Sequence, residues 1–197
     1  MPGTAPARPA LRPLLAFTLR RLWWPALLLP PILLTGLSLH ARWTGFVPDK
    51  DRAEAWALYL LFAAFALGAA QYLRRPEPYW FWLTLLAAAV IFREYHFDNT
   101  TVGIFLLIAG LYVYAWRRYP RFAPYFASRT TLSLMGAMLL SYLLAVGCDK
   151  GWFDFLSGSN ALQNHIEEYV EILGHGLLLA LTLGSGKAEN PLAPEAA

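Results

Sequence analysis

Carboxylates and an imidazole recur at helical spacing near the C-terminus of this 197-residue chain. On a helix through residues 160–182, with about 100° per residue, one arc of roughly 100° collects five polar side chains, which together form a polar stripe: Asn164, Glu167, Glu168, Glu171 and His175. Glu168, Glu171 and His175 follow a three-then-four spacing, so all three can point to one centre or to two adjacent centres. Carboxylates and imidazole are ligands of zinc, iron and manganese. The spacing therefore predicts a divalent-metal site on this helix.

The start of this helix carries its own signal. Asn160 is a residue type that favours the N-cap, and Gln163 follows it three residues later. That spacing predicts a capping box at the beginning of the helix.

Two other predicted helix ends supply further acidic residues. Glu94 and Asp98 lie four residues apart, at the end of an apolar segment over 79–97, and share one helix face. His96 points roughly 160° away from them, which makes it a weaker ligand candidate. Asp149 follows another apolar segment, where a short loop can fold it inward. We predict that Glu94 and Asp98 complete the metal ligands around the stripe.

A metal held in this way can activate water. We therefore expect a metal-dependent membrane hydrolase that acts on a lipid or a lipid-linked substrate, with Glu171, His175 and Asp149 as the catalytic residues. Two motifs of soluble enzymes, the glycine-rich phosphate loop and the His-Glu-x-x-His zinc helix, are absent from the sequence.

Other interpretations of the same residues stay open. Glu167 and Glu168 suit the positive end of a helix dipole without any ligand. Arg93 beside Glu94, or Lys150 beside Asp149, would allow a closed salt-bridge network instead of a metal site. At the level of function, the alternatives are a non-enzymatic subunit, scaffold or sensor of a membrane complex, and a proton- or ion-coupled transport component.

The composition determines the class of protein. The chain is 57% hydrophobic and only 15% charged, whereas a soluble domain carries about 25% charged residues. Apolar stretches of about 20 residues match the hydrocarbon thickness of a bilayer, and six are found, over 22–39, 55–73, 79–97, 102–119, 130–147 and 161–183. We predict an all-α polytopic membrane protein, a bundle of about six transmembrane helices in one domain over 1–197. Residues 1–13 should form a disordered tail and residues 184–197 a loose tail.

The basic residues predict the orientation. Eleven of the 16 Lys and Arg residues flank one side of the predicted bundle: Arg8, Arg12, Arg20, Arg21, Arg74, Arg75, Arg117, Arg118, Arg121, Arg129 and Lys187. By the positive-inside rule, both termini are cytoplasmic and the acidic clusters lie on the opposite side. The formal charge of +3 thus reflects orientation in a membrane and not a nucleic-acid partner. The expected partners are membrane lipids, with a lipid-linked substrate or a membrane protein.

The ends of these segments resemble a pattern in uncharacterised bacterial inner-membrane proteins. It consists of Arg93-Glu94 with Asp98, the pair Asp149 and Lys150, and a Glu-Glu-x-x-Glu start that ends at Glu171. The resemblance covers the C-terminal half of the chain. It implies a bacterial source and a multi-pass location in the inner membrane, and no known activity.

Overall fold

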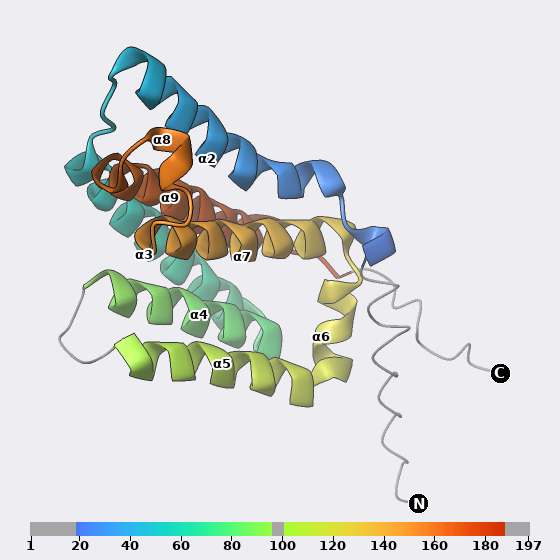
Figure 1. Cartoon of the computed structure of the whole chain (residues 1–197). Coiled ribbons are helices and arrows are strands. Elements are labelled where there is room, and N and C mark those ends of the chain that lie inside the picture. Colours follow the sequence, from blue (N-terminus) through green and yellow to red (C-terminus); the bar gives the residue numbers. More distant parts are fainter. Residues whose placement is uncertain (1–18, 96–100, 188–197) are drawn as a thin grey trace, which may run out of the picture.

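The computed structural model describes residues 19–95 and 101–187, and within these ranges all regular structure is helical. The long helices lie side by side as a bundle and run in alternating directions (Figure 1). They are α2 (Trp24–Thr44), α3 (Lys50–Arg74), α4 (Pro78–Glu94), α5 (Thr101–Arg117), α7 (Arg129–Asp149) and α9 (Asn160–Gly184). The short α6 (Tyr119–Phe126) lies across one end of the bundle, and α8 (Asp154–Ser157) lies at the other end.

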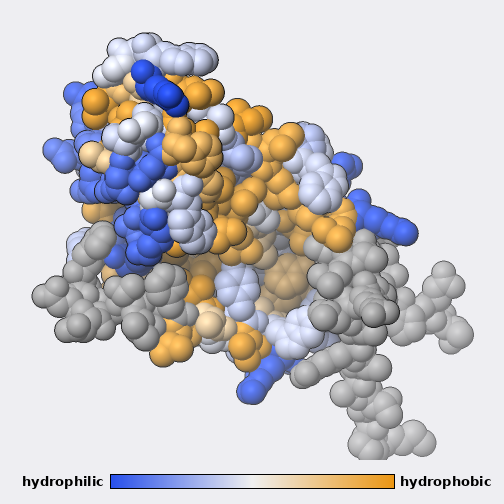
Figure 2. Space-filling model, viewed as in Figure 1, coloured by the Kyte–Doolittle hydropathy of each residue, from blue (hydrophilic) through white to orange (hydrophobic). Residues whose placement is uncertain are grey.

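Three of these helices, α2, α3 and α7, are long and apolar enough to cross a membrane by length and composition. The helix α9 is 25 residues long but carries three glutamates in its first half, and α4 has 17 residues. Figure 2 shows hydrophobic side chains over the middle of the bundle and hydrophilic ones toward its ends. Together these features indicate an all-helical membrane protein.

The helix with the polar stripe, α9, lies at the centre of the bundle. It packs against α2, α3, α4, α7 and α8, whereas α5 packs on α4 and α6 at the periphery. One face of α9 is apolar and fully buried, through Ile166, Val170, Leu178 and Leu181. Burial of this apolar face fixes the rotation of α9 and thereby directs the polar stripe toward α3 and α4.

The start of α9 differs from the prediction. The N-cap is Ser159, whose hydroxyl accepts a hydrogen bond from the backbone N–H of Leu162 at 3.2 Å. The prediction that Asn160 is the N-cap, with a capping box to Gln163, is therefore wrong. The Gln163 side chain is buried and instead donates a hydrogen bond to the Cys148 sulfur at 3.2 Å. This bond joins α9 to the end of α7.

Two glycines let neighbouring helices approach closely. A Cβ on Gly68 of α3 would lie 2.9 Å from Thr84 Oγ1 of α4, so a larger residue would force these two helices apart. A Cβ on Gly174 of α9 would lie 3.0 Å from the Tyr142 ring of α7. The glycine at 174 thus lets α7 approach α9 closely at the depth of the stripe.

At the opposite end of the bundle, contacts hold the residues that follow α9. Lys187 Nζ lies 2.9 Å from Glu77 Oε1, and the Tyr125 hydroxyl donates to Glu77 Oε2 at 2.8 Å. Ser185 Oγ lies 2.6 Å from the hydroxyl of Tyr79. These contacts hold residues 185–187, although the tail predicted to be loose covers residues 184–197. Residues 188–197 of that tail, and the predicted disordered tail over 1–13, lie outside the described residues.

The Glu77 contact predicts a pH dependence. Burial alone would raise the pKa of Glu77, but the hydrogen bonds from Lys187 and Tyr125 lower it below its ordinary value of 4.5. A carboxylate with a lowered folded-state pKa stabilises the protein above pH 4.5, and this contribution is lost as the pH falls through the folded-state pKa. Glu77→Gln should therefore lower the melting temperature at neutral pH, by the equivalent of no more than about 1 kcal/mol for a partly exposed pair.

The measurement is thermal unfolding of the purified protein from pH 7 to pH 3. The difference between the wild type and Glu77→Gln should disappear toward the acidic end. Lys187→Met should show much of the same loss, because it removes one of the two hydrogen-bond donors. Parallel pH profiles for the wild type and Glu77→Gln would contradict the prediction.

Candidate metal centre

Glu94 at the end of α4 meets Glu171 and His175 of α9. One ligand atom from each residue lies within 4.8 Å of the other two. His175 Nε2 is 3.7 Å from Glu94 Oε1. The prediction that Glu94 approaches Glu171 and His175 is confirmed, and the three residues form a group that could hold a metal ion.

These three side chains are withdrawn from solvent. The exposed fraction is 0% for His175, 9% for Glu94 and 6% for Glu171. Two carboxylates in such a place are costly unless a cation accompanies them. The chemistry of the group therefore requires positive charge, from a side chain, a metal ion or a bound molecule.

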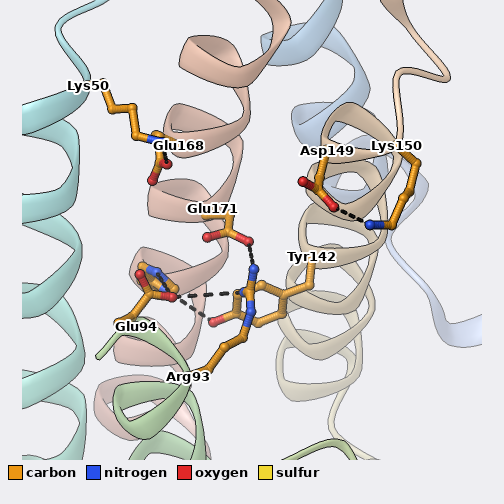
Figure 3. Close-up of polar contacts among 9 residues, drawn as sticks. Lys50, Arg93, Glu94, Tyr142, Asp149, Lys150, Glu168 and Glu171 are labelled. Carbon is orange, nitrogen blue, oxygen red and sulfur yellow. Dashed lines mark hydrogen bonds and ion pairs between the residues drawn. The ribbon is translucent and has the colours of Figure 1, made fainter. Parts of the chain in front are cut away.

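Arg93 provides one such charge. Its guanidinium forms an ion pair and hydrogen bond with Glu171 Oε1 and lies 3.9 Å from Glu94 Oε1 (Figure 3). The Arg93 side chain is 28% exposed, so it approaches the two carboxylates from the solvent side of the group. A metal ion bound to Glu94 and Glu171 would compete with this guanidinium.

The His175 ring is oriented by a residue of α7. The hydroxyl of Tyr142 lies 2.9 Å from His175 Nδ1, while Nε2 is buried and has no hydrogen-bond partner in the described part of the chain. When Nδ1–H donates to the Tyr142 oxygen, Nε2 carries the lone pair and faces the carboxylates. Metal-ligating histidines are commonly held through their second nitrogen in this way. The tyrosine is a supporting residue that the sequence did not reveal.

A cavity of about 200 Å³ adjoins the group. It is lined by five carboxylates, two cationic side chains and one leucine: Glu54, Glu94, Glu167, Glu168, Glu171, Lys50, Arg93 and Leu58. Lys50 Nζ lies 2.9 Å from Glu168 Oε1 and 3.6 Å from Glu54 Oε1. The cavity carries a formal excess of negative charge when all five acids are ionised.

The other predicted site residues lie elsewhere. Glu168 lines the cavity but turns to Lys50 and is not in the three-residue group. Asp149 is exposed, does not line the cavity, and pairs with Lys150 at 2.6 Å, which raises the pKa of that lysine (Figure 3). Asp98 and His96 lie outside the described residues.

Comparisons with protein families, with curated proteins and with solved structures find no match to this chain. The geometry of the site is therefore the basis for the function proposed below.

Proposed function

We propose that Glu94, Glu171 and His175 bind a divalent cation and that the protein is a metal-dependent membrane hydrolase. The observation that carries this proposal is the buried His175 Nε2, which has no hydrogen-bond partner in the described residues and lies beside two carboxylates whose side chains are less than one-tenth exposed. Three protein ligands leave a coordination position open, as catalytic zinc sites do. The two carboxylates and one imidazole suit zinc, iron or manganese.

The chemistry of a hydrolase follows from the surroundings of the group. A divalent metal there would lower the pKa of a bound water and so supply a nucleophile near neutral pH. The adjoining cavity gives a substrate access to this position, and Arg93 and Lys50 can hold an anionic group of that substrate. Because the cavity lies in a helical membrane protein, a lipid or a lipid-linked molecule is the substrate class that we propose.

The topology forms part of the proposal. The described residues form six long helices in alternating directions, which is consistent with six spans, and the arginine-rich ends of the helices favour cytoplasmic termini. The cavity would then open on the opposite side. If the source is bacterial, that side is the periplasm and the membrane is the inner membrane.

One observation favours a second candidate, a non-enzymatic subunit or sensor of a membrane complex. Arg93 already neutralises Glu171, and Lys50 already neutralises Glu168. In this alternative the ion pairs stabilise the bundle and the cavity carries out no chemistry.

The test is metal binding by the purified protein in detergent. Metal analysis and titration with zinc, manganese or iron(II) should show one ion per chain, and Glu94→Gln should weaken its binding more than about hundredfold, because loss of a residue that only supports a ligand already costs about 10–100-fold. Glu168→Gln is the matched control, because it removes a carboxylate from the same cavity but not from the three-residue group. Equal losses in the two variants, or a wild type that binds no metal, would refute the site.

A further inference from the structure

A second cavity lies toward the arginine-rich end of the bundle, and it shares no lining residue with the cavity beside the carboxylate group. This groove of about 330 Å³ runs between the starts of α2 and α7 and over α9. It is lined by Trp23, Ala26, Leu29, Arg129, Thr130, Ser133, Leu134 and Leu177. Its volume lies at the lower end of the range of about 300–1,000 Å³ that is usual for small-molecule sites.

The groove is lined mainly by apolar side chains, and a hydrogen bond between the start of α2 and α7 holds its two sides together. Ala26 and Leu177 are buried beneath it, while Leu29 and Trp23 stand at its edge with about half of their surface exposed. The backbone N–H of Trp23 donates to Ser133 Oγ at 2.8 Å, and Ser133 Oγ donates to the Arg129 carbonyl at 2.7 Å. These two bonds tie α2 to α7 and satisfy the backbone N–H of Trp23 and the hydroxyl of Ser133 within the groove.

The mouth of the groove is cationic. Arg129 is exposed and forms no ion pair with any residue in the described part of the chain. Trp23 stands nearby, and tryptophan favours the depth of the lipid headgroups. A guanidinium binds phosphate through paired hydrogen bonds. Basic pockets between membrane helices are a recurring site for anionic lipid headgroups.

We propose that this groove binds one anionic phospholipid. Arg129 holds the phosphate, and an acyl chain lies in the groove against Leu29, Leu134 and Leu177. The apolar part of the lining suits a hydrocarbon chain, and Arg129, which has no ion-pair partner among residues 19–95 and 101–187, suits an anionic headgroup. A phospholipid with a net negative charge supplies both. This site is independent of the metal centre proposed above.

The experiment is native mass spectrometry of the delipidated full chain titrated with phosphatidylglycerol or phosphatidylcholine. The wild type should bind one phosphatidylglycerol with about fivefold preference, the effect of roughly one well-placed cationic side chain. Arg129→Ala should remove this preference. Arg121→Ala is the matched control, because it removes the same charge from α6, which lies at the same end of the bundle but outside the groove, and it should keep the preference.

Thr130→Trp fills the groove without a change of charge and should weaken the binding of both lipids. Three outcomes of these titrations would overturn the proposal. They are equal affinity of the wild type for the two lipids, equal losses in Arg129→Ala and Arg121→Ala, and unchanged phosphatidylglycerol binding in Thr130→Trp. Competition by glycerol phosphate as strong as by phosphatidylglycerol would also overturn it, because the groove would then bind only the anionic headgroup.

Discussion

His175→Gln is expected to lower the affinity for zinc or manganese more than about hundredfold. Loss of residues that only support a ligand costs about 10–100-fold in metal affinity, so loss of a ligand should cost more. His175 is fully buried, its Nε2 lies 3.7 Å from Glu94 Oε1, and it supplies the imidazole of the three-residue group. Glutamine is similar in length and keeps the space filled, so the fold should be retained. Isothermal titration of the purified protein measures the affinity.

A graded series of variants makes this result specific. Tyr142→Phe removes only the hydroxyl that orients His175 Nδ1, so it should weaken metal binding about tenfold. Asp149→Asn should leave the affinity unchanged, because Asp149 is exposed and paired with Lys150 outside the cavity. If His175→Gln binds metal as tightly as Asp149→Asn does, the imidazole is not a ligand.

The centre of the site was predictable because periodicity determines which side chains share a helix face. Glu171 and His175 lie four residues apart on α9, and the buried apolar face of that helix decides where they point. Glu94 was predictable in the same way, since an acid at the end of a short apolar helix must face something polar. These inferences need only one helix at a time.

The partners of the site were less predictable because they depend on how helices rotate against one another. Tyr142 is one of many aromatic residues in apolar segments, and only the close contact with Gly174 places it on His175. Lys50 reaches Glu168 from the first turn of α3, a contact between residues far apart in the chain. Asp149 was expected to fold inward, but the end of α7 leaves it exposed beside Lys150.

Local rules also failed where two neighbouring residues compete for one position. Ser159 and Asn160 are both good N-cap residues, so the sequence does not decide which of them begins α9. The hydroxyl of Ser159 takes the position, while the Gln163 side chain donates to the Cys148 sulfur in the buried contact with α7. Tertiary packing thus overrides the capping pattern.

Glu171→Gln and Arg93→Met are expected to destabilise the protein singly and to compensate for each other in combination. Glu171→Gln leaves the partly exposed Arg93 with Glu94 as an acidic neighbour, at a cost of about 1–2 kcal/mol, or roughly 2–8 °C in melting temperature. Arg93→Met leaves two carboxylates that are less than one-tenth exposed without this cation, at a cost of about 3 kcal/mol. The double variant should lose about 1–2 kcal/mol less than the sum, because the two residues form one ion pair.

Metal added to the same four proteins separates a metal centre from a purely structural network. In Arg93→Met the carboxylates no longer face a competing guanidinium, so saturating zinc or manganese should raise its melting temperature more than that of the wild type. Lys50→Met is the matched control: it removes the other cation of the cavity, which pairs with Glu168, and should respond to metal much as the wild type does. Coupling between Arg93 and Glu171 with no metal response in any variant would leave the ion pair as a structural contact and exclude the metal centre.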